Sequence, residues 1–143
     1  MLIGGLWHPC DDGFVRPVLP GEVLAADGTW KKLLFLVDTG ADRTVFSGDC
    51  LAGLGLPQEG TDRLGGVGGV VGSVTVTTQI RFTRENGDKI LFRGKYAAIP
   101  ERDALDMSVL GREILNLFAV VVDRPQDVVC LIRSPHTYTV GQG

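Results

Sequence analysis

The residues with the clearest capacity for chemistry are three in succession, Asp38-Thr39-Gly40, directly after the apolar run Leu33–Val37. A carboxylate that acts as an acid or a base must be held rigidly and still face its substrate. A buried strand that ends in a loop of small residues meets both needs. The Thr39 hydroxyl can lock such a loop, and Gly40 lets two backbone segments approach closely. The alternative is an ordinary Asp-Thr-Gly turn, which the tripeptide alone does not exclude.

A glycine-rich segment, Leu64–Val70, has three possible interpretations. A phosphate-binding loop is disfavoured, because the segment has no G-x-x-x-x-G-K-[ST] pattern and no basic residue, and the β-branched stretch Ser73–Thr78 follows it where a helix should begin. A second interpretation is a flexible loop without a role. A third is a mobile hairpin that closes over an extended substrate, in which glycine backbone groups hydrogen-bond to a peptide main chain. The residues by themselves leave the last two open.

A third segment, Val109-Leu110-Gly111-Arg112, is by itself an ordinary junction between a strand and a short helix. The order of the three segments, however, resembles the retropepsin family, the aspartic peptidases of retroviruses and their cellular relatives. The resemblance covers about residues 14 to 133 of the chain. It is closer to cellular and bacterial members than to viral ones, because the chain continues past the helix into the hairpin Phe118–Ile132 and a tail.

The resemblance implies a homodimer of closed β-barrels and assigns roles to the motif residues. Asp38 becomes the catalytic acid, Thr39 bonds to its counterpart across the dimer axis, and Gly40 contacts the substrate main chain. The next residues, Ala41, Asp42 and Arg43, lie beside the substrate. Because Arg43 is not the residue of the viral pattern, we expect it to favour acidic or polar substrate side chains.

The resemblance also assigns roles to the other two segments, Leu64–Val70 and Val109–Arg112. The glycine-rich stretch becomes the flap, with Val67 near its tip. Asp42 and Arg112 match positions of a structural ion pair near the dimer interface, to which Gly111 also belongs. The flap residues in contact with substrate are then Gly65, Gly66, Val67, Gly68 and Gly69.

The chain has a single Asp-Thr-Gly and no Asp-Ser-Gly, whereas this chemistry needs two carboxylates. One carboxylate is ionised and acts as the general base for a water, and the other is protonated and donates to the carbonyl oxygen. The second Asp38 must therefore come from another copy, related by a two-fold axis. The reaction requires neither a metal nor an organic cofactor.

Short strands joined by turns should position these residues, in one all-β domain over residues 1–143 with a core at about 14–133. The run Leu33–Val37 is apolar on both faces and should be an internal strand. One short C-terminal helix is expected over Gly111–Leu117, with a single further turn at Asp49–Leu54. Three hairpins are predicted, Glu22–Ala26 with Leu33–Val37, Val74–Arg84 with Lys89–Arg93, and Phe118–Val122 with Val128–Ile132.

The composition excludes several other classes of protein. Fourteen basic and seventeen acidic residues give a net charge of −3, which does not favour nucleic acid as a partner. No apolar run approaches the ~20 residues of a membrane helix, and the N-terminus lacks the features of a signal peptide. Three widely spaced cysteines indicate a reducing compartment with neither a disulfide framework nor a zinc site. These cysteines are Cys10, Cys50 and Cys130. We therefore expect a cytoplasmic protein that binds no membrane.

The leading hypothesis is an aspartic endopeptidase that cleaves extended peptide segments between apolar residues. A catalytically silent peptide-binding or scaffold module on the same fold is the alternative, since fold does not imply function. A structural β-domain with a fortuitous motif is the third hypothesis. It is disfavoured because crowding an unpaired carboxylate is costly without a use.

Overall fold

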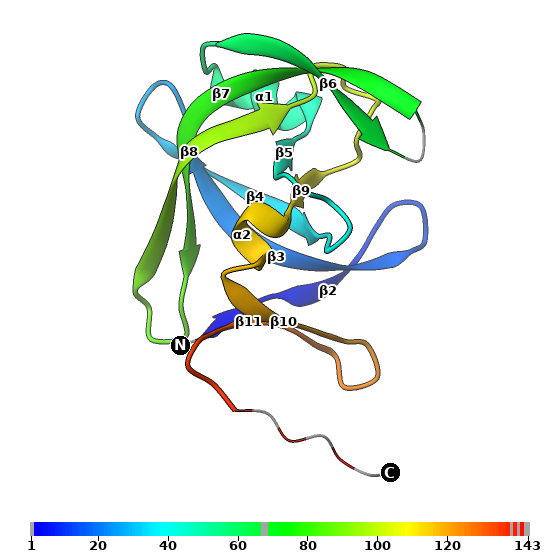
Figure 1. Cartoon of the computed structure of the whole chain (residues 1–143), viewed down its shortest axis with the longest axis vertical. Helices are drawn as coiled ribbons and strands as arrows, with labels where there is room; N and C mark the ends of the chain where they lie inside the picture. Colours follow the sequence, from blue (N-terminus) through cyan, green and yellow to red (C-terminus); the bar gives the residue numbers. More distant parts are fainter. Residues whose placement is uncertain (1, 67–68, 138, 140, 142–143) are drawn as a thin grey trace.

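The computed structural model of the chain describes residues 2–66, 69–137, 139 and 141. These residues form a mostly β structure with two short helices (Figure 1). The elements in chain order are β1 (Leu2–Gly4), β2 (Leu6–Pro9), β3 (Val15–Leu24), β4 (Trp30–Val37), β5 (Val45–Phe46), α1 (Gly48–Leu54), β6 (Gly60–Gly66), β7 (Gly69–Thr83), β8 (Lys89–Ala98), β9 (Ser108–Leu110), α2 (Arg112–Leu115), β10 (Phe118–Asp123) and β11 (Val128–Arg133).

The larger sheet closes on itself into a barrel. Its strand order is β2-β3-β4-β9-β5-β8-β7-β6, and β7 also pairs with β3 through Glu22 opposite Arg81 and Val23 opposite Ile80. Strand β7 has 15 residues, which is long enough to pair with β6 near one end and with β3 nearer the other. The expected closed β-barrel is thus confirmed. A smaller sheet of order β1-β11-β10 lies at the lower end of the barrel in Figure 1.

All three predicted hairpins are present. Strands β3 and β4 pair around a turn in which Gly28 has a φ of 84°, and β7 and β8 pair around Gly87 with a φ of 88°. Both values lie in the left-handed region that glycine adopts without steric cost, which explains the Asp-Gly and Asn-Gly pairs there. Strands β10 and β11 pair from Phe118 opposite Arg133 to Asp123 opposite Val128.

Both helical segments expected from the sequence, at Asp49–Leu54 and Gly111–Leu117, are present with somewhat different bounds. Helix α1 runs through Gly48–Leu54, because the Ser47 hydroxyl accepts a hydrogen bond from the Cys50 amide at 3.3 Å and Gly55 ends the helix with a φ of 63°. Helix α2 ends at Leu115 and is shorter than expected, since the chain enters β10 at Phe118. Neither of them, nor any other helix in the described residues, has the length and apolarity needed to cross a membrane.

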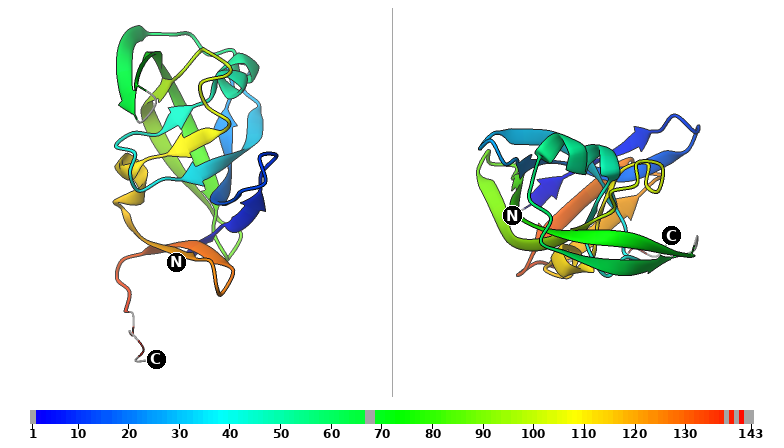
Figure 2. Two further views of the ribbon diagram at one scale, coloured as in Figure 1. Left: turned by 90° about the vertical axis from the view of Figure 1, so that its right-hand side faces the viewer. Right: turned by 90° about the horizontal axis from the view of Figure 1, so that it is seen from above.

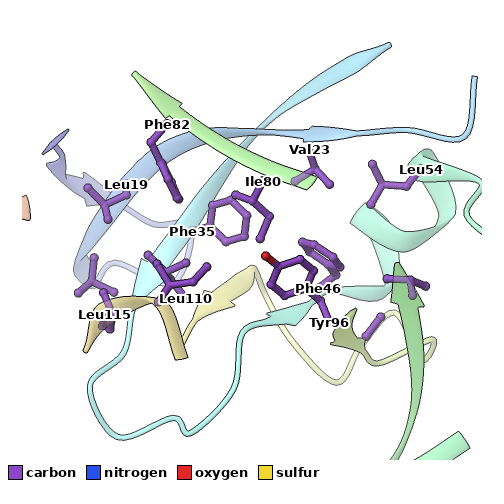
Figure 3. Close-up of a cluster of buried hydrophobic side chains, with 14 of the residues drawn as sticks. Leu19, Val23, Phe35, Phe46, Leu54, Ile80, Phe82, Tyr96, Leu110 and Leu115 are labelled. Atoms are coloured by element: carbon purple, nitrogen blue, oxygen red, sulfur yellow. The ribbon is translucent and has the colours of Figure 1, made fainter. Parts of the chain in front are cut away.

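The core of the barrel is built on aromatic rings from separate strands (Figure 3). The ring of Phe35 on β4 lies 5.7 Å from that of Phe82 on β7 and 6.3 Å from that of Phe46 on β5. Strand β4 lies between β3 and β9, as its apolar sequence predicts. Phe35 and Val37 are buried, whereas the alternate residue Leu36 is only half-buried. Because side chains alternate along a strand, Leu36 and Asp38 belong to the same, more open face of β4.

Candidate active site

Asp38 is the first residue after β4, and its backbone and side chain are both held. Its amide donates a hydrogen bond to the carbonyl oxygen of Leu110 at 3.3 Å, and its own carbonyl accepts from Ala41 at 3.2 Å. The Gly40 amide donates to the carboxylate oxygen Oδ1 at 3.0 Å. The side chain remains half-buried. The carboxylate is therefore oriented by the loop that follows it and is still accessible.

The strand register brings the third sequence motif to the first. Strands β4 and β9 are parallel, with Val37 opposite Leu110, so Gly111 follows β9 next to the loop after Asp38. A Cβ on Gly111 would lie 2.2 Å from the carbonyl carbon of Arg43. Only glycine fits where two backbones approach this closely. This contact is the physical reason for a glycine in the Leu110-Gly111-Arg112 segment.

Further hydrogen bonds join these two segments. The hydroxyl of Thr44, a fully buried residue, accepts from the Gly111 amide at 3.1 Å. The Thr44 amide donates to the carboxylate of Glu113, and the Arg112 amide donates to the Ala41 carbonyl at 2.8 Å. The sequence reasoning missed both Thr44 and Glu113. A hydroxyl residue ahead of the apolar pair Val45–Phe46 is a weak sign of a buried polar contact, whereas Glu113 gives no signal of its own.

The ion pair that the resemblance implies is present, since the Arg112 guanidinium donates to Asp42. The two side chains are 47% and 80% exposed, so the pair contributes little to the stability of a single copy. Arg43 is exposed. Thr39 is exposed as well, and within the described residues its hydroxyl makes no hydrogen bond.

The glycine-rich segment forms the end of the β6–β7 hairpin. Gly65 pairs with Val70, and Gly66 pairs with Gly69, whose φ is 105°. Val67, expected near the tip of the flap, and Gly68, expected within the flap, lie outside the described residues. In Figure 1 the hairpin extends to the right, on the side where the chain leaves β4. The left-hand view of Figure 2 looks at this side and shows the hairpin above the ends of β4 and β9.

A cavity of about 750 Å³ opens beside the end of β4. Leu36 and Val109, which pair across β4 and β9, contribute apolar side chains to its lining. The other lining residues come from the β2–β3 hairpin, between His8 and Arg16, and from the loop before β9, residues 103–107. Sequence reasoning did not anticipate this cavity, because three distant segments form it.

The charges around the cavity are mostly negative. Asp12 accepts two hydrogen bonds from the Arg16 guanidinium, at 3.0 and 2.6 Å. This contact lowers the pKa of Asp12 and raises the pKa of Arg16, so both stay charged near neutral pH. The cavity lining includes three more carboxylates, those of Asp11, Asp103 and Asp106, and all three are exposed.

Two solved protease structures are similar to the chain. A retropepsin-like aspartic protease from Rickettsia conorii has 19% sequence identity and a TM-score of 0.56, with 92% of this chain and 88% of that chain covered. EIAV protease, in a complex with the inhibitor HBY-793, has 25% identity and a TM-score of 0.48, with 71% of this chain and 86% of that chain covered. The first likeness shows a common fold. A search of curated protein sequences gave no match.

The family model of the retroviral aspartyl protease matches residues 21–122, from Gly21 in β3 to Val122 in β10. This range includes Asp38-Thr39-Gly40, the β6–β7 hairpin and the Gly111 segment. Because the match spans well over half of the 143 residues, the chain belongs to the retroviral aspartyl protease family.

Proposed function

We propose that the chain is an aspartic endopeptidase that works as a homodimer, with one Asp38 from each copy. The observation that carries the proposal is the Asp38 carboxylate itself. Its Oδ1 is held 3.0 Å from the Gly40 amide at the end of an internal strand, and the chain has no second Asp-Thr-Gly. A rigid, accessible carboxylate is what general acid and base catalysis needs.

In the proposed reaction the two Asp38 carboxylates share one proton, because two like charges about 3 Å apart do not both ionise. The ionised copy removes a proton from a water, and the resulting hydroxide attacks the peptide carbonyl carbon. The protonated copy donates its proton to the carbonyl oxygen. Collapse of the tetrahedral intermediate breaks the C–N bond and passes a proton to the leaving amine. No cofactor takes part in these steps.

The neighbouring residues have proposed roles in positioning. The exposed hydroxyl of Thr39 would bond to its counterpart in the partner copy and so fix the two loops against each other. Gly40 and the residues Ala41, Asp42 and Arg43 would contact the substrate. The β6–β7 hairpin would act as the flap and hold an extended peptide through its backbone. The small sheet packs on the barrel through buried Leu131, which supports treating the chain as one peptidase domain.

A catalytically silent peptide-binding module remains the alternative, and one experiment separates the two functions. The purified full chain is incubated with casein at several pH values, with and without pepstatin. The peptidase predicts casein fragments whose formation pepstatin suppresses, and a dimer by light scattering under the same conditions. A pure, folded dimer that produces no fragments at any pH from 3 to 8 would favour the silent module.

A further inference from the structure

The cavity is lined by the strand that leads to the proposed catalytic residue. Leu36 lines the cavity, and Asp38 is two residues further on the same face of the chain, about 7 Å along the strand. Val109 on the neighbouring strand also lines it and precedes Leu110, whose carbonyl binds the Asp38 amide. A peptide bound at Asp38 therefore places a side chain next to the cleaved bond within reach of this cavity.

The cavity is large enough to hold a substrate side chain. Its volume of about 750 Å³ lies within the range of ~300–1,000 Å³ typical of small-molecule sites. Leu36, Leu105 and Val109 supply apolar surface. Hydrocarbon segments of a substrate side chain can pack on this surface, and any polar end must then reach the rim.

The rim of the cavity carries a net negative charge. Four aspartates and one arginine belong to the lining, and the ion pair between Asp12 and Arg16 cancels one charge of each sign. The remaining carboxylates are those of Asp11, Asp103 and Asp106. None of these three has an ion pair with another residue in the described part of the chain. Their charges are thus available to a ligand.

An apolar surface with an anionic rim fits a long side chain that ends in a cation. Lysine and arginine bury their methylene groups on apolar surface and keep the charged end near water and carboxylates. A metal ion is a poorer fit, since nowhere in the described residues do three His, Cys, Asp or Glu side chains come together to hold one. We infer that this cavity selects peptides with Lys or Arg beside the cleaved bond.

The inference rests on the proposed peptidase function and sharpens its substrate class. In the proposed dimer each copy supplies one such cavity, so the inference modifies the expectation of cleavage between apolar residues on both sides of the cleaved bond. Arg43 does not line the cavity, so the expected preference of Arg43 for acidic or polar side chains concerns a different position of the substrate.

Two peptides that differ only in Lys or Met at the residue beside the cleaved bond test the inference. Lysine and methionine are both long and unbranched, so the ratio of their kcat/KM values reports the charge. The unaltered chain should favour the Lys peptide. In the variant with Asp103→Asn and Asp106→Asn together the ratio should fall about fivefold or more, since each exposed ion pair contributes up to about that factor. Raising the salt concentration should lower the ratio in the unaltered chain, because exposed charges are screened.

Asp27→Asn is the matched control. It removes one exposed negative charge, against two in the test variant, and an Asn side chain can still accept the hydrogen bond from the Thr29 amide that Asp27 accepts at 3.0 Å. Asp27 lies in the turn at the opposite end of β4, about 20 Å along the strand from Leu36. The ratio should therefore be unchanged in this variant. A uniform loss in all charge variants would show that net charge and not this cavity sets the preference.

A binding measurement separates the inference from the proposed function. The full chain with Asp38→Asn is titrated with fluorescent forms of the two peptides, and anisotropy gives the two Kd values. Tighter binding of the Lys peptide that depends on Asp103 and Asp106 supports the inference, even if the unaltered chain cleaves nothing. Equal kcat/KM values for Lys and Met in an active enzyme overturn the inference and leave the peptidase assignment intact. If neither cleavage nor preferential binding is found, both are wrong.

Discussion

Gly111 lies so close to Arg43 that a Cβ would sit 2.2 Å from the Arg43 carbonyl carbon and 2.3 Å from its oxygen. Through this contact the backbone of the loop after Asp38 packs directly against the backbone at the start of α2. Around it, the Gly111 amide bonds to the Thr44 hydroxyl and the Arg112 amide bonds to the Ala41 carbonyl. The position of the proposed catalytic loop therefore depends on a residue more than seventy positions away in the sequence.

Gly111→Ala should destabilise the protein by about 3 kcal/mol, at the upper end of overpacking effects, because the clash is with backbone and cannot be relieved by a rotamer change. Peptidase activity should fall together with the stability, because the clash displaces the loop that carries Asp38. Urea unfolding at fixed protein concentration measures the change. Gly53→Ala is the control, as its Cβ would meet nothing within 4 Å and alanine favours the helix that contains it. A Gly111→Ala variant of normal stability and activity would contradict the close contact.

Asp38→Asn should abolish peptide hydrolysis and leave the fold and the dimer intact. The substitution keeps the size of the side chain, and an Asn oxygen can still accept the Gly40 amide that Asp38 Oδ1 accepts at 3.0 Å. It removes the group that exchanges a proton. Circular dichroism and light scattering check the fold and the dimer, and a peptide assay checks the activity. Measurable turnover by the pure variant would refute the assignment of Asp38.

Much of the fold could be predicted from local patterns. The Asp27-Gly28 and Asn86-Gly87 turns identify two hairpins, because few other residues adopt the backbone they require. The length of helix α1 was underestimated. Its two ends are set by Ser47 and Gly55, which are separated by the whole helix and have to be recognised together. The pairing of β7 with β3 was not predictable in this way. It joins residues some sixty positions apart and has no local signature.

In the candidate site, too, some residues have a local signal in the sequence and others act only through long-range contacts. Asp38, Gly40 and Gly111 are recognisable because their types and order are distinctive. Thr44 and Glu113 were missed, since their contacts arise only when β5 pairs with β9 and brings Thr44 next to the residues that follow β9. The cavity was missed for the same reason, as it combines the β2–β3 hairpin with β4 and the loop before β9. The flap and the cytoplasmic location stay predictions.

The β10–β11 hairpin is expected to form part of the dimer interface. Strand β10 is an edge strand of its sheet in the described structure, and unpaired edges favour association. Leu117 beside it is 58% exposed, and Val122 on it is 46% exposed. Deleting everything from Phe118 onward, however, would remove Val129 and Leu131 from the core and would unfold the chain. Surface substitutions are therefore the better test.

Leu117→Asp combined with Val122→Asp should weaken the dimer at least tenfold in Kd, because two charges would be brought into an apolar contact. Activity should fall at low protein concentration and recover as the concentration rises. Sedimentation equilibrium measures the Kd. Leu91→Asp, at another exposed leucine (42%), is the control. A double variant that dimerises as tightly as the unaltered chain would place the interface elsewhere.

Gly69→Val should lower activity more than stability. Gly69 has a φ of 105°, which a β-branched residue adopts only with strain, and it pairs with Gly66 at the end of the β6–β7 hairpin. Gly60→Val, at the other end of β6, is the control, because Gly60 has no positive φ and a Cβ there would meet nothing within 4 Å. Steady-state kinetics and thermal unfolding compare the two variants. Unchanged kinetics for Gly69→Val would mean that this hairpin is not a flap.

Glu22 lies where the barrel closes, and its contribution to the stability of the fold should depend on pH. It lies opposite Arg81 in the β3–β7 pairing and accepts from the guanidinium at 3.1 and 3.2 Å. Mainly through these hydrogen bonds, with a smaller contribution from the charge of Lys89, the pKa of Glu22 is held below its ordinary value of 4.5. Arg81 also lies 4.0 Å from the ring centre of Trp30, which limits its freedom to turn away.

The direction of the pH effect follows from that lowered pKa. Below pH 4.5 the unfolded chain binds a proton at Glu22 before the folded chain does, so the stabilisation is complete above pH 4.5 and is lost as the pH falls through the lower folded pKa. Glu22→Gln should therefore reduce the free energy of unfolding by about 0.5–1 kcal/mol at pH 7, and the difference should shrink at pH 3. Urea unfolding of both forms at pH 7, 5 and 3, at one protein concentration, measures it. In an Arg81→Gln background the same substitution should lose most of its effect, as expected for two side chains that stabilise each other. A difference that stays constant down to pH 3 would mean that packing, and not the ion pair, accounts for the contribution of Glu22.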